Sequence, residues 1–148
     1  MINTKGLFFI SFFKISSFFT KNKFLKIIGL PIRLLYKLVI NYIVGIDIHD
    51  ETTIGSNFQV FHGHGLVIHK NTIIGNNVIV RQNTTIGSAI DGGQAPTIGN
   101  NVNIGANSVI IGSVHIGDNS VIGAGSVVIK NVVENTTVVG NPARMIKS

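Results

Sequence analysis

The stretch that decides the fold is IGNNVNIGANSVIIGSVHIGDNSVIGAGSVV, residues 98–128. A branched apolar residue recurs there at every sixth position: Ile98, Ile104, Ile110, Ile116, Ile122 and Val128. A small or β-branched residue follows four places after each of the first five: Val102, Ser108, Val114, Ser120 and Ser126. A period of six fits neither an α-helix nor a single strand, so it indicates one short unit stacked on itself.

Most units also contain a residue type that tolerates positive φ. Three places after the branched residue come Asn101, Asn107, Asn119 and Gly125, with Ser113 as the exception. Such residues form sharp corners, so each unit predicts a short strand and a corner. Three units of about eighteen residues together would close one coil, with the stiff branched side chains stacked inside. The sequence therefore predicts a mainly β protein, a parallel β-helix of hexapeptide repeats.

The charged residues are distributed unevenly along the chain. Twelve Lys and Arg oppose six Asp and Glu, and seven of those twelve precede the first acid, Asp47. The repeats that follow are close to neutral, which removes the main argument for a nucleic-acid partner. The chain contains no cysteine, which excludes disulfides, thiolate metal sites and a cysteine nucleophile. This composition fits a reducing compartment, and we expect a cytoplasmic protein.

Residues 1–44 form an apolar and basic segment ahead of the repeats. Residues 7–19 hold six phenylalanines but are too short, and interrupted by Lys14, to span a bilayer. Residues 24–42 have apolar residues three to four places apart, broken at Gly29-Leu30-Pro31, which predicts short amphipathic helices. Two interpretations stay open: peripheral contact with the anionic inner face of the cell membrane, or packing on the β-helix or on a neighbouring subunit.

The repeats fill the second domain, residues 45–148, and their register breaks once within residues 61–67. Two extra residues are accommodated there, between two series of branched residues that each keep the six-residue step: Ile48, Ile54 and Val60, then Ile68, Ile74, Val80 and Ile86. Asparagines predict corners on either side of the break: Asn57, Asn71, Asn77 and Asn83. Regular stacking needs no such exception, so this break is a candidate functional site.

Two further segments leave the repeat. Residues 88–95 lack a branched residue at position 92 and predict a loop that projects from the coil. Residues 138–146 depart from the pattern at Pro142, and we expect them to close the end of the coil, where strand edges would otherwise be exposed.

The register break contains His62 and His64 between glycines. Histidine takes up and returns protons near neutral pH, and the glycines would let a substrate approach the backbone. By this chemistry either histidine is a candidate general base. A histidine that is structural or merely exposed is the alternative.

Four motifs resemble, in order and spacing, the serine acetyltransferase branch of the hexapeptide-repeat acyltransferases: GIDIH at 45–49, IG at 54–55, HGHGLVI at 62–68 and TIG at 85–87. The resemblance implies a left-handed β-helix, acetyl-coenzyme A as the acetyl donor and a homotrimer with active sites between subunits. It implies that His62 is the general base for the acceptor hydroxyl and that Asp47 orients it. No metal is expected.

The resemblance also implies a donor site. In sugar-acetylating relatives small residues let the pantetheine arm run along the coil, and these match Ala106 and Ala124. Lys130 and Arg144 match residues that pair with the phosphates of coenzyme A. Gly87 is expected to offer its backbone N–H to the thioester carbonyl, where negative charge grows during attack. Simple packing is the alternative for the alanines, and ordinary surface charge for the two basic residues.

The acceptor positions depart from the serine acetyltransferase pattern. Phe61 stands where that branch has its serine-binding aspartate, and Gln94-Ala95 replaces an Arg-His pair. These departures favour a sugar hydroxyl, as in the short O-acetyltransferases of capsule and lipopolysaccharide biosynthesis. We expect Phe61, His64 and Gln94 to line the acceptor site. Serine O-acetylation and a non-catalytic β-solenoid scaffold are the alternatives.

A zinc-dependent hydratase, as in the γ-class carbonic anhydrases, is a further alternative on the same fold. It needs three histidines that converge on zinc between subunits, and this chain offers His62, His64, His69 and His115. Their spacing does not resemble the pattern of that family.

Overall fold

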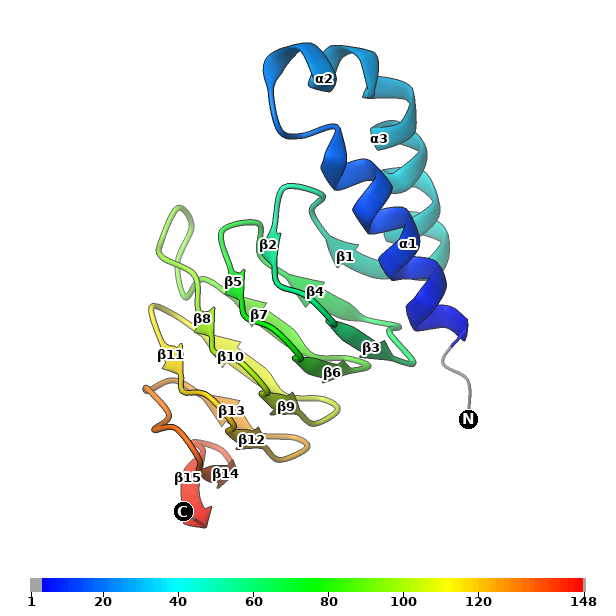
Figure 1. The fold of residues 1–148 in the computed structure, drawn as a ribbon. Coiled ribbons are helices and arrows are strands. Elements are labelled where there is room, and N and C mark those ends of the chain that lie inside the picture. The colour runs from blue at the N-terminus through cyan, green and yellow to red at the C-terminus, as the bar shows by residue number, and fades with distance from the viewer. Residues whose placement is uncertain (1–3, 148) are drawn as a thin grey trace.

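The computed structural model describes residues 4–147, a coil of short strands with helices at one end (Figure 1). The helical segment contains α1 (Thr4–Phe18), α2 (Lys23–Ile28), α3 (Leu30–Tyr36) and a π-helix, η1 (Lys37–Val44). Gly29 ends α2 and Pro31 lies in the first turn of α3, where its missing N–H breaks no hydrogen bond. The predicted interruption at these residues is confirmed.

The strands form three sheets that run along the coil. Sheet A contains β1 (Ile46–Ile48), β4 (Leu66–Ile68), β7 (Thr85–Gly87), β10 (Val109–Ile111) and β13 (Val127–Val128). Sheet B contains β2 (Thr53–Ile54), β5 (Ile73–Ile74), β8 (Thr97–Ile98) and β11 (His115–Ile116). Sheet C contains β3 (Gln59–Phe61), β6 (Ile79–Arg81), β9 (Asn103–Ile104), β12 (Val121–Ile122), β14 (Thr137–Val139) and β15 (Arg144–Lys147).

From β1 to β14, successive strands in the sequence belong to different sheets, and neighbours within a sheet are parallel. The last two strands, β14 and β15, are antiparallel neighbours in sheet C. This confirms the predicted mainly β fold, a parallel β-helix with an N-terminal helical segment. The six branched residues that recur at every sixth position from Ile98 to Val128 fill the inside of the coil, since each is at most 2% exposed. Small hydroxyl residues fit beside them, and Ser108 Oγ donates to Gly105 O at 2.8 Å.

Asparagine forms most of the predicted corners. Seven asparagines have φ between 54° and 61°: Asn57, Asn77, Asn83, Asn101, Asn107, Asn119 and Asn135. Their side chains form a ladder between coils, since Asn77 Nδ2 donates to Asn101 Oδ1 and Asn101 Nδ2 to Asn119 Oδ1, each at 2.9 Å. In the repeat of Ser113, the residue with positive φ is Gly112.

The predicted corner at Asn71 is present, but its backbone conformation differs from that of the other asparagine corners. The chain turns there without positive φ, and the Thr72 N–H donates to His69 O at 2.9 Å. The Asn71 N–H donates to His69 Nδ1 at 3.2 Å, so a histidine side chain satisfies the turn instead. This corner follows sheet A, whereas the asparagine corners follow sheets B and C.

Both interruptions of the repeat are present. A regular coil advances by eighteen residues, as from Ile68 to its partner Ile86. The first coil advances by twenty, from Ile48 to Ile68, because the corner at residues 62–65 is longer. The coil from Ile74 to Ile98 advances by twenty-four, and residues 88–96 project as a loop between β7 and β8.

The helical segment packs against the first coil. Phe9 and Phe13 of α1 are buried, and α1 lies along β3. The Tyr36 hydroxyl donates to Ile48 O at 2.8 Å, and Ile40 of η1 is fully buried. Among residues 4–147, no helix combines the length and the hydropathy that crossing a bilayer requires.

A buried ion pair fixes this packing. Asp50 is 5% exposed and accepts hydrogen bonds from Arg33 Nε at 2.8 Å and Ser16 Oγ at 2.7 Å. Burial alone would raise the pKa of Asp50, but the hydrogen bonds from Arg33 and Ser16 outweigh it and hold the pKa below its ordinary value. One carboxylate of the coil thereby joins α1 and α3.

Candidate active site

The corner between β3 and β4 differs from the other corners of the coil. Three of its four residues have positive φ: His62 at 67°, Gly63 at 59° and Gly65 at 68°. Within residues 4–147, every other non-glycine residue with positive φ is an asparagine. Holding a histidine in this region costs free energy, and such conformations concentrate at functional sites.

Neighbouring coils hold this corner in place. The Asn83 N–H of the next coil donates to His64 O at 2.8 Å, and the His64 N–H donates to His62 O at 2.8 Å. Gly63 lies so close to the first coil that a Cβ atom would stand 2.7 Å from Ile46 Cδ1. A larger residue at position 63 would therefore displace the Ile46 side chain and would be strained at this positive φ. Both histidine side chains are exposed and accessible to a substrate.

A residue of α1 also reaches the corner. Lys5 Nζ lies 3.4 Å from His64 Nε2. This places a cation of the helical segment beside the two candidate histidines. Sequence reasoning missed Lys5, because it precedes His64 by 59 residues and no repeat relates the two.

Asp47 points outward from β1 on the face of sheet A. Its Oδ1 accepts a hydrogen bond from Asn41 Nδ2 at 2.9 Å. Within the described residues, the Asp47 side chain is therefore hydrogen-bonded to Asn41 and not to His62. Asn41 belongs to η1, and the sequence carries no signal for its role.

Asp47 and Gly87 line one groove of about 490 Å³ along sheet A. Val67 and Thr85 form its floor on β4 and β7, and the loop from Ser88 to Gly92 completes it. The structure thus brings a predicted orienting residue and a predicted donor-site residue to the same groove.

The other predicted donor residues form two pairs. Ala106 and Ala124 lie on successive coils, since the Gly125 N–H donates to Ala106 O at 2.9 Å. They follow strands of sheet C, as His62 does, and so stand at the same edge of the coil. Lys130 and Arg144 line a groove of about 350 Å³ at the C-terminal end.

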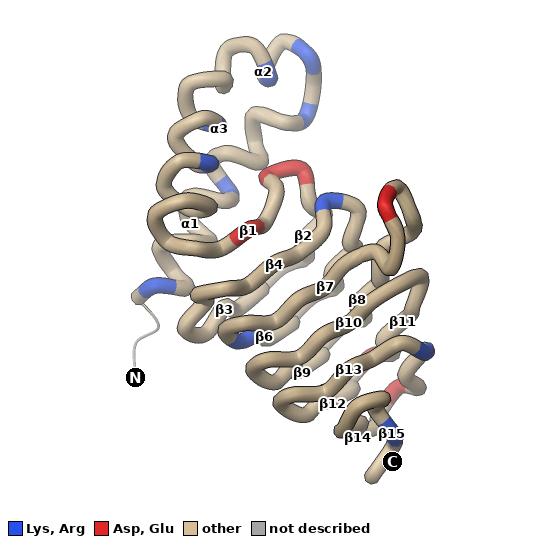
Figure 2. The backbone as a smooth tube through the Cα atoms, turned by 180° about the vertical axis from the view of Figure 1, so that it is seen from behind, with Lys and Arg blue, Asp and Glu red and all other residues tan. Residues whose placement is uncertain are grey.

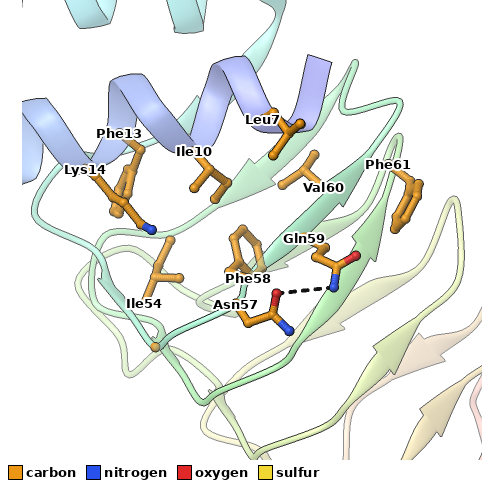
Figure 3. A pocket seen from close by; sticks show the side chains of 12 residues that line it. Leu7, Ile10, Phe13, Lys14, Ile54, Asn57, Phe58, Gln59, Val60 and Phe61 are labelled. Atoms are coloured by element: carbon orange, nitrogen blue, oxygen red, sulfur yellow. Dashed lines mark hydrogen bonds between the residues drawn. The ribbon is translucent and has the colours of Figure 1, made fainter. Parts of the chain in front are cut away.

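Of the predicted acceptor residues, Phe61 and His64 lie at the same corner of the coil, whereas Gln94 lies elsewhere within one chain. Phe61 lies on sheet C, lines a groove of about 600 Å³ beneath α1 (Figure 3) and has the Arg81 guanidinium 6.0 Å from its ring centre. Gln94 is exposed within the projecting loop, and its Oε1 accepts from Ser113 Oγ at 2.6 Å. They differ in position because the loop leaves the coil between sheets A and B, whereas β3 belongs to sheet C.

Residues 4–147 hold no group of three His, Cys, Asp or Glu side chains that could bind a metal ion. Within one chain, the candidate site has three parts: the exposed His62–Gly65 corner, the groove beside Asp47 and the basic groove at the C-terminal end.

Comparisons with known proteins point to one kind of repeat. The family model described as bacterial transferase hexapeptide (six repeats) matches residues 95–130. A search of curated protein sequences finds no match. Solved structures are similar over nearly the whole chain, and three serine acetyltransferases are among them.

Soybean serine acetyltransferase complexed with serine is 33% identical, with a TM-score of 0.84 over 97% of this chain and 58% of that chain. Serine acetyltransferase from Brucella abortus strain S19 in complex with coenzyme A is 30% identical, with a TM-score of 0.83 over 97% and 56%. The Neisseria gonorrhoeae enzyme is 32% identical, with a TM-score of 0.83 over 97% and 56%.

The present chain thus spans less than three fifths of the length of these enzymes, and the likeness covers its helices as well as its coil. The family model over residues 95–130, the observed coil and the identity over 97% of the chain show that this protein is similar to the hexapeptide-repeat transferases.

Proposed function

We propose that this protein is an acetyl-coenzyme A-dependent O-acetyltransferase with His62 as its general base. The observation that carries the proposal is the conformation of His62, an exposed histidine at positive φ where the coil elsewhere uses asparagine. The similar Brucella abortus enzyme in complex with coenzyme A supports the donor.

In the proposed reaction the acceptor oxygen attacks the carbonyl carbon of the thioester while His62 takes the hydroxyl proton. The carbon–sulfur bond then breaks, and His62 returns the proton to the leaving thiolate. A positioned base contributes about 10²–10⁴-fold to such a step. The chain has no cysteine to carry an acetyl group, so we propose direct transfer within a ternary complex.

In this proposal Asp47 would be the orienting carboxylate, which would hold the imidazole in the useful tautomer and stabilise its charged form. In this structure its Oδ1 binds Asn41 and not His62, so the role requires Asp47 to contact the imidazole when substrates bind. Asn41 holds the Asp47 carboxylate at the edge of the groove through their 2.9 Å hydrogen bond. Gly87 lies in the same groove, where its backbone would face the thioester carbonyl. Lys130 and Arg144, which share the C-terminal groove, would pair with the phosphates of coenzyme A.

Serine and a sugar are the two candidate acceptors. The comparisons support serine better than the carbohydrate predicted from the sequence, because the soybean enzyme is complexed with serine at 33% identity. Lys5 beside His64 adds a cation that could pair with a carboxylate. One observation favours a sugar: Phe61, next to His62, offers an aromatic face and no carboxylate for an amino group.

The proposal predicts how variants separate chemistry from donor binding. His62→Ala should lower kcat by about 10²-fold or more and leave the Kd for acetyl-coenzyme A unchanged. Lys130→Ala should chiefly weaken the donor, because it removes a phosphate partner. Stopped assays of thiol release with serine and with a panel of sugars give kcat, and calorimetry gives the Kd.

His64→Ala is the matched control, two residues away in the same corner. Near-normal turnover in His62→Ala together with loss in His64→Ala would overturn the assignment of the base. Absence of acetyl-coenzyme A binding by the full chain would leave a non-catalytic solenoid as the explanation. The acceptor panel decides between serine and sugar by the ratio of kcat/KM values.

A further inference from the structure

Helix α2 buries none of its six residues. It stands beyond the first coil, at the end of the molecule opposite the C-terminus (Figure 1). Phe24 and Ile27 on this helix are 71% and 75% exposed, and Ile28 is 55% exposed. Within residues 4–147, α2 contacts α3 and its Lys26 pairs with Glu51, but these contacts leave the apolar side chains of the helix exposed.

The exposed apolar residues of the chain gather in the helical segment. In the part of the chain that the structure describes, thirteen of the twenty-one exposed large apolar side chains lie between residues 4 and 44, and the rest are scattered over the coil. An exposed apolar surface of this kind usually contacts a membrane or another protein. The charge of the helical segment distinguishes between a membrane and a protein as the partner.

The helical segment contains no acidic residue, and two of its basic residues are already paired. Lys26 Nζ lies 2.6 Å from Glu51 Oε1, and Arg33 binds Asp50. Lys21 precedes α2 and Lys23 is its first residue. Neither makes an ion pair with the described acids, although Lys21 lies 5.2 Å from the ring centre of Phe18. Figure 2 shows Lys and Arg gathered over the helices and sparse along the coil.

We propose that residues 18–28, here called the helical tip, dock on an anionic bilayer surface. Phe24, Ile27 and Ile28 would enter the boundary between headgroups and acyl chains, as apolar side chains of interfacial helices do. Lys21 and Lys23 would remain among the anionic headgroups. Lys26 stays with Glu51 and holds α2 to the corner after β1. This charge pattern favours lipid over a second copy of the chain, whose tip would carry the same positive charge.

Vesicle co-sedimentation of the full chain tests the proposal, with vesicles of phosphatidylcholine alone or mixed with phosphatidylglycerol. The wild-type protein should bind the mixed vesicles and release them at high salt. The variant K21Q/K23Q should bind about thirtyfold more weakly, since each lysine near the surface contributes about fivefold. The variant F24S/I27S should lose about tenfold or more in affinity through its apolar contact.

The control variant K70Q/I73S removes a lysine and an exposed isoleucine from the coil and should bind like the wild type. Circular dichroism checks that each variant keeps its helices and strands. Equal vesicle binding by wild type and both tip variants would overturn the proposal, as would no binding at all. Self-association of the wild type, lost in F24S/I27S without any vesicle binding, would identify a second copy as the partner and overturn it too.

Discussion

At the scale of the residue, one backbone conformation serves two purposes in this coil. Asn101 adopts φ of 56° to turn a corner, and its amide extends the ladder between coils. His62 adopts φ of 67° and presents an imidazole at an exposed corner. Positive φ costs asparagine little free energy because its short polar side chain forms local hydrogen bonds. The His62 side chain takes no part in the asparagine ladder, so its presence at this corner favours a role in the reaction.

Replacement of Asn101 separates the two contributions of a corner asparagine. Asn101→Ala should lower the free energy of unfolding by about 2–3 kcal/mol, from the left-handed conformation and the two lost amide bonds. Asn101→Gly should lower it by about 1 kcal/mol, because glycine accepts positive φ and loses only the amide bonds. Urea unfolding measures both. Equal losses in the two variants would show that backbone conformation contributes little.

Residue patterns identified most corners and the candidate base, because a strict period exposes any exception. They could not identify the corner chemistry at Asn71, where the His69 side chain accepts from the backbone. Nor could they identify Lys5 and Asn41, which reach His64 and Asp47 from the helical segment. The six-residue period carries no information about which helix residues contact which corner of the coil.

At the scale of the element, the helices and the coil are joined through Asp50. Its carboxylate binds Arg33 of α3 and Ser16 of α1, and it is almost fully buried. The sequence predicted helices before the coil and left open whether they pack on it. The structure shows that one face packs, through Phe9, Tyr36 and Ile40, while α2 stays exposed. Which faces of the helices pack depends on the shape of the first coil. The six-residue repeat does not encode that shape.

Removal of the Asp50 charge should loosen this junction. Asp50→Asn should lower the free energy of unfolding by about 3 kcal/mol at pH 7, because it removes the buried carboxylate that binds Arg33 and leaves Arg33 with the longer, 3.5 Å contact to Glu51. The pKa of Asp50 is lowered in the folded protein, so the contribution is complete above the unfolded value of about 3.9 and is lost as the pH falls through the folded value. Urea unfolding between pH 2 and pH 7 measures this dependence.

The exposed Glu134 provides the comparison for this variant, and Glu134→Gln should leave the stability at pH 7 almost unchanged. Asp50→Asn should also show a flatter dependence on pH in the acid range than the wild type. A wild-type stability that rises as the pH falls below 4 would contradict the assigned direction.

At the scale of the whole molecule, the candidate site is incomplete within one chain. Phe61 and Gln94 lie on different sides of the coil, and the grooves beside Asp47 and Lys130 are open. Val67, on the sheet A groove, is 40% exposed. A neighbouring copy could cover these faces and supply the missing wall of a cleft.

We therefore expect a homotrimer. Sedimentation equilibrium at micromolar concentration should give about three times the chain mass of 15.9 kDa. We expect the trimer because the coil is nearly neutral, so that its flat faces can associate without charge repulsion. A monomeric mass under these conditions would refute the assembly and, with it, an active site between subunits.

The two ends of the coil are finished differently, and this limits how far the stack can extend. Coils of parallel strands present open backbone donors and acceptors at each end, to which a further molecule could add as in a growing fibre. At one end α1 lies along β3, and at the other β15 turns back antiparallel on β14. Each molecule thus terminates its own stack, and a repetitive sequence built for continuous pairing stays a discrete particle.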